Sequence, residues 1–459
     1  MTIPGETLWA KTALTAQGWA DDVIVEIDTA GRIASVATGP APANARQVGI
    51  LLPAPTNLHS HAFQRAMAGL TEARGPDPQD SFWTWRRLMY QFLDHLTPDD
   101  IGAITAFVQM EMLEAGYGAV CEFHYLHHQP GGAAYDDRAE MSARVASAAE
   151  DTGIGLTLLP VAYQFGGCDG RGLGPGQARF GNEPHQYAQL LEGAGRALAP
   201  LGPDAILGVA PHSLRAVSRA HLADLAQMLP AGPFHMHLAE QVAEVDEIKA
   251  HYGVRPVAWL LDNHAVDARW CLIHLTQMEP AETEAVARTG AVAGLCPITE
   301  ASLGDGIFDG LRHAAAGGRI GIGSDSNIRI TLCEELRMLE YSQRLRDRGR
   351  AMFATPDRST GRVLFDAAAA HGAQAAGRDA GRIEAGAWAD LLELDATAID
   401  MIGKTGDTIL DAFIFAGSDQ MVRQVWSAGR HVVADGRHRD HARITARYGK
   451  VLGAIMGRI

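Results

Sequence analysis

Residues 51–65 read LLPAPTNLHSHAFQR, a short apolar run that leads into two histidines, His59 and His61, two positions apart. In a β-strand, residues i and i+2 point to the same face, so both imidazoles would converge on one point. Two neutral imidazoles at the end of a strand supply half of a tetrahedral zinc site. An isolated H-x-H more often has one packed and one hydrated histidine, because histidine has intermediate burial. The metal interpretation therefore depends on the rest of the chain.

The middle of the chain alternates short apolar runs with longer helical patterns, which is typical of βα units. One helix start is explicit, because Thr97-Pro98-Asp99-Asp100 gives an N-cap, a proline at the first position and two acids in the first turn. Eight parallel strands, each followed by a helix, predict an α/β fold of the (β/α)8 TIM-barrel type. A doubly wound open sheet is the alternative, but no Gly-rich phosphate loop follows an early strand. The candidate strands are residues 51–58, 119–125, 155–161, 206–212, 233–238, 270–275, 291–296 and 319–325.

Both ends of the chain alternate polar and apolar residues between turn signals. Val23, Val25 and Ile27 point one way before a turn at 29–31, which predicts a β-hairpin. A similar alternation of polar and apolar residues occurs at 389–395 and 422–438. We therefore expect a small β-sandwich domain from residues 1–52 and 376–440, a metal-dependent barrel catalytic domain at 53–375 and a C-terminal helix at 441–459.

Composition excludes several classes of partner. The 459 residues, 47% hydrophobic and 20% charged, form an ordinary globular profile that accommodates a barrel and an accessory module. A formal net charge of −15 argues against a nucleic-acid or anionic-membrane partner. Five scattered cysteines without a C-x-x-C pair indicate reduced thiols. No signal-peptide pattern and no apolar run of about 20 residues occurs, so we expect a cytoplasmic protein.

Catalytic groups of a TIM barrel lie at the carboxyl ends of its strands. Reading only those ends adds further candidates, namely His235, His237, Glu240, His274 and Asp325. Zinc accepts nitrogen and oxygen ligands at about 2.0–2.2 Å. Three histidines and one carboxylate are thereby available as a ligand set: His59, His61, His237 and Asp325.

Each of these residues also has a plainer interpretation. His274 alone reads as a core histidine with a satisfied partner, and Asp325 alone as the cap of a helix that begins near Thr331. His235 faces the same way as His237 and is a rival ligand. Packing does not readily explain their joint occurrence at four strand ends, which favours a metal site.

The pattern resembles the amidohydrolase superfamily in its mononuclear deaminase branch, through His59-Ser60-His61, His237 with Glu240, His274 and Ser324-Asp325. The fourth-strand sequence GVAPHS has no lysine for carbamylation, which speaks against a two-metal site. Residues 381–395, GRIEAGAWADLLELD, resemble the segment with which such chains re-enter their β-sandwich. More narrowly, NLHSHAFQRAMAGL, DSFWTWRRLMY, EFHYLHH, APHSLRAV and HMHLAEQ resemble members that act on N-formimino-L-glutamate in histidine degradation.

The resemblance implies a reaction and a set of site residues. The reaction is metal-dependent hydrolytic deimination of N-formimino-L-glutamate to N-formyl-L-glutamate and ammonia, by a homodimer with one Zn²⁺ per subunit. The implied zinc ligands are His59, His61, His237 and Asp325. The implied catalytic residues are Glu240, His274 and Asp325, and the implied substrate-binding residues are Gln64, Arg86, Tyr125, His212 and Arg215.

Chemistry supports this assignment of roles. A zinc ion lowers the pKa of bound water toward about 7. Asp325 would accept the proton of the attacking water, Glu240 would pass protons to the departing ammonia, and His274 would stabilise the tetrahedral intermediate.

Arginine suits the two carboxylates of this substrate because its planar guanidinium binds them bidentately. Arg86 and Arg215 are the candidates, although either also reads as a solvated surface charge, and Tyr125 and Gln64 would add neutral hydrogen bonds.

Two other functions stay open. A mononuclear deaminase of guanine or a related heterocycle would need apolar stacking walls and no paired arginines. A non-catalytic metal-binding scaffold would need none of the extra acid/base groups. The three-histidine, one-aspartate set also admits Fe²⁺ or Mn²⁺ in place of zinc. Residues 166–181, GGCDGRGLGPGQARFG, are interpreted as a substrate-covering loop.

Overall fold

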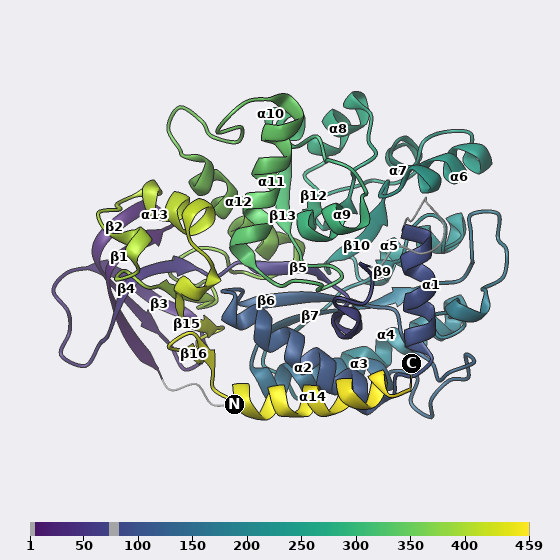
Figure 1. The fold of residues 1–459 in the computed structure, drawn as a ribbon, viewed down its shortest axis with the longest axis horizontal. Helices are drawn as coiled ribbons and strands as arrows, with labels where there is room; N and C mark the ends of the chain where they lie inside the picture. The colour runs from purple at the N-terminus through teal and green to yellow at the C-terminus, as the bar shows by residue number, and fades with distance from the viewer. Residues whose placement is uncertain (1–4, 73–81, 459) are drawn as a thin grey trace.

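The computed structural model describes residues 5–72 and 82–458 (Figure 1), so the start of the SFWTWR segment lies outside the described residues. Its centre is a ring of parallel strands in two hydrogen-bonded sheets. The bridges Ser60–Asp325 and Val209–Phe234 join the two sheets to one another. The barrel is therefore closed, which confirms the TIM-barrel prediction and excludes the open doubly wound sheet. Its strands are β5 (Thr56–Ser60), β6 (Ala119–His124), β7 (Gly155–Ala162), β8 (Ile206–Leu207), β9 (Ala210–Pro211), β10 (Phe234–Leu238), β11 (Trp270–His274), β12 (Val292–Leu295) and β13 (Arg319–Ile322).

Helices follow the barrel strands in sequence and lie around the barrel (Figure 1). They are α1 (Phe82–Leu93), α2 (Pro98–Glu114), α3 (Glu140–Thr152), α4 (Pro184–Leu198), α5 (Arg219–Met228), α6 (Val242–Tyr252), α7 (Pro256–Asn263), α8 (Pro280–Ala287), α9 (Pro297–Leu303), α10 (Gly310–Ala315), α11 (Leu332–Asp347) and α12 (Thr360–Ala375). Helix α2 begins as predicted, because the Thr97 hydroxyl accepts the Asp100 N–H and the Asp100 carboxylate accepts the Thr97 N–H. None of the helices in the described residues is long and apolar enough to span a membrane.

Two of the expected strands are divided in the structure. The run 51–58 is shared between β4 (Arg46–Pro53) outside the barrel and β5 inside it. Prolines at 53 and 55 lack the N–H that a continuous ladder needs. The run 206–212 breaks at Gly208, where a Cβ would lie 2.9 Å from the Pro233 carbonyl oxygen. Strand β7 therefore pairs separately with β8 and β9.

Strands from both ends of the chain form one eight-stranded sheet, in the order β17-β16-β15-β14-β4-β1-β2-β3. Val23, Val25 and Ile27 are buried in its own apolar cluster, together with Leu391 and Trp426. This confirms a β-domain built from both termini, and the domain limits given above stay a prediction. The strands besides β4 are β1 (Glu6–Thr15), β2 (Gly18–Ile27), β3 (Ile33–Thr38), β14 (Leu391–Leu394), β15 (Val422–Ser427), β16 (Arg430–Ala434) and β17 (Arg437–His438).

Two α-helices follow the barrel in the described residues, α13 (Asp407–Asp411) and α14 (His441–Met456). Helix α14 runs alongside α2 (Figure 1), where Tyr448 stacks on Phe107 with ring centroids 4.0 Å apart. The last segment of the chain thus packs on the helix layer of the barrel.

Candidate metal centre and active site

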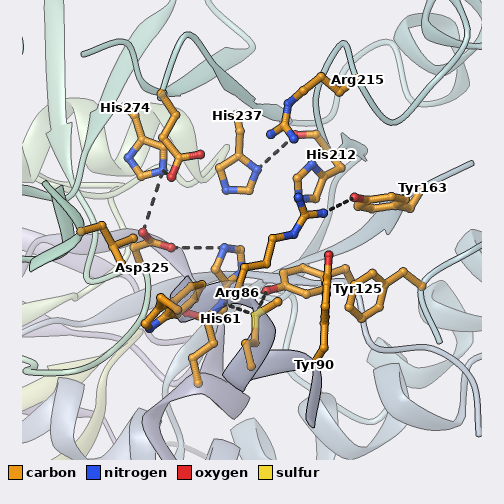
Figure 2. A pocket seen from close by; sticks show the side chains of 16 residues that line it. His61, Arg86, Tyr90, Tyr125, Tyr163, His212, Arg215, His237, His274 and Asp325 are labelled. Carbon is orange, nitrogen blue, oxygen red and sulfur yellow. Dashed lines mark hydrogen bonds and ion pairs between the residues drawn. The ribbon is translucent and has the colours of Figure 1, made fainter. Parts of the chain in front are cut away.

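The carboxyl ends of the barrel strands open into a cavity (Figure 2). All predicted catalytic and substrate-binding residues line it, and so do three of the four predicted metal ligands. The lining includes His61, Gln64, Arg86, Tyr125, His212, Arg215, His237, Glu240, His274 and Asp325. His59 lies beside this lining and has no exposed surface.

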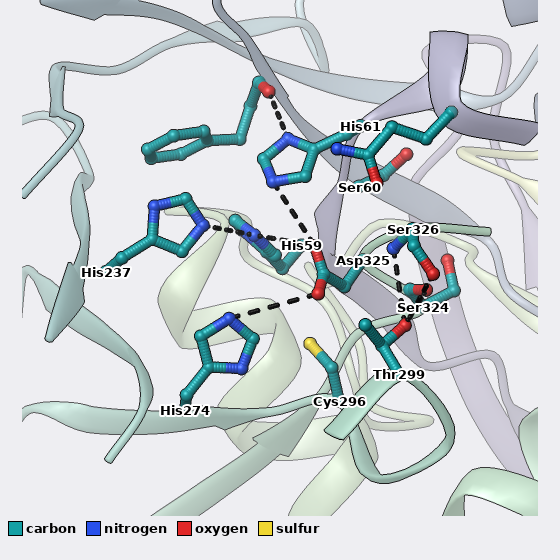
Figure 3. Close-up of polar contacts among 12 residues, drawn as sticks. His59, Ser60, His61, His237, His274, Cys296, Thr299, Ser324, Asp325 and Ser326 are labelled. Carbon is teal, nitrogen blue, oxygen red and sulfur yellow. Dashed lines mark hydrogen bonds and ion pairs between the residues drawn. The ribbon is translucent and has the colours of Figure 1, made fainter. Parts of the chain in front are cut away.

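Histidine nitrogens and one carboxylate converge on a point beside this cavity (Figure 3). Asp325 Oδ1 lies 3.5 Å from His59 Nε2 and 3.2 Å from His61 Nε2. His237 Nε2 lies 3.1 Å from His59 Nε2. Ligand bonds of about 2.0–2.2 Å in a tetrahedron place ligand atoms about 3.3–3.6 Å apart. These residues therefore fit a single ion of the size of zinc.

His274 also reaches this group. Ligand atoms of His59, His237, His274 and Asp325 all lie within 4.8 Å of one another. The His274 Nε2 lies 3.9 Å from Asp325 Oδ2, farther than the corresponding separations of His59 and His61 from Oδ1. The geometry thus offers two overlapping ligand sets. Both contain His59, His237 and Asp325, and the fourth ligand is His61 in one set and His274 in the other.

Backbone carbonyls orient two of the imidazoles. His61 Nδ1 lies 2.7 Å from the Phe123 oxygen, and His237 Nδ1 lies 3.1 Å from the His212 oxygen. When Nδ1–H donates to a carbonyl, Nε2 presents its lone pair, as in most metal-binding histidines. Burial lowers the pKa of His59 to about 3 and also lowers the pKa values of His61 and His237. These imidazoles are therefore neutral, which is the form that binds a metal.

A buried polar network holds the loop that carries Asp325 against strand β5. Asn57 Nδ2 donates to Ser324 Oγ at 2.7 Å, and Ser324 Oγ bonds to Asn327 Oδ1 at 2.6 Å. Asn327 Nδ2 donates to Ser60 Oγ at 3.1 Å. Asp325 and Asn327 have positive φ angles of 47° and 54°, a region in which aspartate and asparagine are enriched among non-glycine residues. The network thus fixes the loop that carries the Asp325 carboxylate.

Glu240 and His274 lie close to each other, next to the candidate metal centre. His274 Nε2 lies 3.8 Å from Glu240 Oε1, and its Nδ1 lies 3.2 Å from Glu300 Oε1. Burial alone would lower the pKa of His274, but the carboxylates of Glu240, Glu300 and Asp325 outweigh it and raise the pKa to about 10. Burial raises the pKa of Glu240 to about 7, although His274 opposes the shift. Glu240 can therefore both accept and release a proton near neutral pH.

The opposite wall of the cavity carries the two predicted arginines (Figure 2). Arg86, on α1, donates from Nη2 to the Tyr163 hydroxyl at 3.2 Å. Arg215 is 6% exposed, its Nε is buried without a partner, and it forms no hydrogen bond or ion pair with a described residue. Gln64 Nε2 donates to the Tyr125 hydroxyl at 2.7 Å. A buried, unpaired guanidinium is costly unless an anion joins it.

Two of the alternative interpretations, His235 as a metal ligand and Asp325 as a helix cap, do not fit the geometry. His235 Nε2 lies 2.7 Å from the Ala375 carbonyl oxygen, so this rival ligand is committed elsewhere. His235 comes two residues before His237 on β10, which places it about 6.6 Å farther from the carboxyl end of the strand. Helix α11 is capped by Thr331, whose hydroxyl accepts the Glu334 N–H, so Asp325 is not its cap.

Several residues in or beside the cavity were not predicted from the sequence, among them two tyrosines and a glutamate. Tyr90 and Tyr163 line the cavity, and Glu300 accepts the hydrogen bond of His274 Nδ1. Tyr163 directly follows β7 and so lies at a strand end, as the histidines do. Tyr90 and Glu300 lie on helices, where no spacing signals an inward role.

Residues 50–432 match the "Amidohydrolase family", and residues 6–48 match "Formimidoylglutamate deiminase HutF, N-terminal domain". A formimidoylglutamate deiminase of Pseudomonas aeruginosa is 48% identical over 98% of this chain and 99% of its own. An 8-oxoguanine deaminase of the same organism is 27% identical over 89% of this chain and 88% of its own. A crystal structure of an amidohydrolase from Brucella melitensis shares 46% identity and a TM-score of 0.94, covering 98% of this chain and 100% of that one. The chain belongs to the amidohydrolase family.

Proposed function

We propose that this protein is a formimidoylglutamate deiminase, which hydrolyses N-formimino-L-glutamate to N-formyl-L-glutamate and ammonia in histidine degradation. The observation that carries the proposal is one cavity that combines a histidine–aspartate centre with two arginines, Arg86 and Arg215. The substrate has one amidine and two carboxylates, which match these two halves of the cavity. The 48% identical Pseudomonas aeruginosa relative bears the same activity in its name.

We propose one Zn²⁺ in each subunit, held by His59, His61, His237 and Asp325. The shorter separations of His59 and His61 from the Asp325 carboxylate support this set over the one that contains His274. An ion there lowers the pKa of water toward about 7 and so supplies a nucleophile at neutral pH.

The residues around the amidine then move protons. Asp325 accepts a proton from the attacking water, and Glu240 carries protons to the nitrogen that leaves as ammonia. His274, protonated between carboxylates, stabilises negative charge that develops on the attacking oxygen. The glutamate portion of the substrate is bound by side chains of the opposite wall, namely Gln64, Arg86, Tyr125, His212 and Arg215.

Ammonia release from purified, zinc-loaded protein tests this function. We expect release from N-formimino-L-glutamate and none from guanine, because a planar heterocycle has no carboxylate for Arg86 and Arg215 to bind. Preference for guanine would establish a heterocycle deaminase instead. No release from any amidine or amide would favour a non-catalytic metal-binding scaffold.

We also propose that the enzyme is a cytoplasmic homodimer, which the resemblance to the iminohydrolases of histidine degradation supports. Light scattering on the purified protein distinguishes a dimer from a monomer or a tetramer. Cell fractionation tests the location.

A further inference from the structure

Tyr163 lies at the end of the Arg86 side chain, and the proposed roles do not include it (Figure 2). Its side chain is 3% exposed and lines the cavity directly after strand β7. Two groups donate to its hydroxyl oxygen, Arg86 Nη2 at 3.2 Å and Gln177 Nε2 at 2.8 Å. Among the described residues, none accepts the proton of this hydroxyl.

A tyrosine hydroxyl accepts through its oxygen and donates one proton. Here both partners are donors, since a guanidinium has no acceptor and Gln177 presents its amide nitrogen. The Gln177 amide cannot be reversed without loss, because its Oε1 accepts the Gly174 N–H at 3.0 Å. The O–H of Tyr163 is therefore left to point at a third group.

The loop at 166–181 supplies this arrangement. Gln177 is the last residue of a short 3-10 turn, η2 (Pro175–Gln177), and is buried. A Cβ on the preceding residue, Gly176, would lie 2.3 Å from Tyr90 Cγ, so the turn sits directly against a residue of the cavity wall. Only glycine permits that approach, and it brings Gln177 within reach of Tyr163.

We propose that Tyr163 is a third carboxylate-binding residue, which donates its O–H to the substrate carboxylate held by Arg86, and that Gln177 is the positioning residue that fixes this O–H. The positive charges of Arg86 and Arg215 make an anion the favoured acceptor at this position. The inference rests on the proposed function for the identity of the dicarboxylate. It assigns the Gly-rich loop a role in specificity.

The first test is Tyr163→Phe, which removes only the hydroxyl. Loss of a hydrogen bond to a charged group weakens binding by about 10- to 100-fold. We expect KM for N-formimino-L-glutamate and the calorimetric Kd of N-formyl-L-glutamate to rise by that factor, with unchanged zinc content. Tyr187→Phe is the matched control, because this buried tyrosine donates to the Pro160 carbonyl oxygen at 2.9 Å and does not line the cavity.

The second test is a double-mutant cycle. Gln177→Leu should raise the Kd of N-formyl-L-glutamate in the wild-type background and change it little in the Tyr163→Phe background, because Gln177 acts through Tyr163. Gln177→Glu should weaken binding at least as strongly, since a carboxylate there would accept the Tyr163 proton and turn it from the cavity. Additive effects in the cycle would overturn the positioning role.

Binding and turnover separate the two proposals. If wild-type protein binds N-formyl-L-glutamate and Tyr163→Phe binds it equally well, the role of Tyr163 is wrong whatever the turnover. If Tyr163→Phe binds more weakly but wild-type protein does not deiminate N-formimino-L-glutamate, the carboxylate site stands and the proposed function fails. No binding of the dicarboxylate by wild-type protein overturns both.

Discussion

At the scale of single residues, Arg215 carries a buried charge that forms no ion pair or hydrogen bond with a described residue. Arg215→Met removes the charge and keeps most of the apolar stem. We expect KM for N-formimino-L-glutamate to rise by about 100-fold or more, because a charged contact to the substrate is lost. The Tm should stay equal or rise, because an unpaired buried charge is removed. A large fall in Tm with an unchanged KM would make Arg215 a structural residue.

His61 and His235 offer a matched pair for the metal site. His61→Ala should deplete bound zinc, because its Nε2 lies 3.2 Å from Asp325 in the proposed ligand set. His235→Ala should keep zinc, because that imidazole bonds to the Ala375 carbonyl oxygen. Metal analysis after gel filtration distinguishes them. Full zinc in His61→Ala together with depletion in His274→Ala would select the other ligand set.

Glu240 is predicted to act on protons and not on the metal. Glu240→Gln keeps the shape of the side chain, so we expect zinc content to be unchanged and kcat to fall by about 10²–10⁴-fold. Glu192→Gln serves as the control, because that carboxylate is exposed on α4 and pairs with Arg196. Ammonia release together with metal analysis measures both properties. Loss of zinc from Glu240→Gln would contradict this role.

The sequence predicted those residues at the site that lie at strand ends and have charged or metal-binding side chains. His59, His237 and Asp325 follow from that rule, since catalytic groups lie at the carboxyl ends of barrel strands. Tyr163 obeys the same rule but was missed, because tyrosine is common in cores and its position alone carries no chemical signal. The proposed role of its hydroxyl depends on Gln177, a hydrogen-bond donor 14 residues away in a loop.

At the scale of elements, helix α2 shows local chemistry that a sequence expresses directly. Thr97→Ala removes the side-chain half of its capping box. We expect the free energy of unfolding to fall by about 1 kcal/mol. Urea unfolding measures this change, and KM and kcat should not move, because Thr97 does not line the cavity. An unchanged urea midpoint would show that packing alone sets the start of α2.

Strand boundaries were harder to predict than helix starts, for a physical reason. An apolar run marks burial but does not identify the sheet that buries it, and the run 51–58 contributes to two sheets through β4 and β5. The break at Gly208 depends on the neighbouring Pro233 carbonyl, which belongs to another segment. The sequence alone does not show such contacts between segments that are far apart along the chain.

At the scale of the whole molecule, the two-part architecture was predictable because the ends and the middle of the chain differ in hydrophobic period. The contact between the two parts was not predictable from the sequence. Arg378, which follows α12, has a fully buried side chain and bonds from Nη2 to Asp390 Oδ2 at 2.9 Å, just before β14. Asp204, before β8, lies 3.5 Å from Arg378 and 2.6 Å from Arg430 of β16. This network ties the barrel to the terminal sheet through residues far apart in sequence.

Arg378→Met tests whether that network holds the two parts together. Removal of one partner leaves the Asp390 charge buried and uncompensated, so we expect the free energy of unfolding to fall by about 3–5 kcal/mol. Adding Asp390→Asn should recover part of this loss, because a neutral amide is cheaper to bury and its oxygen still accepts the Ala428 N–H. Zinc content and KM should match wild type at temperatures where both variants are folded, since neither residue lines the cavity. If Arg378→Met were as stable as wild type, the terminal sheet would be held by its apolar contacts alone, and the ion pairs would only set the orientation of the two parts.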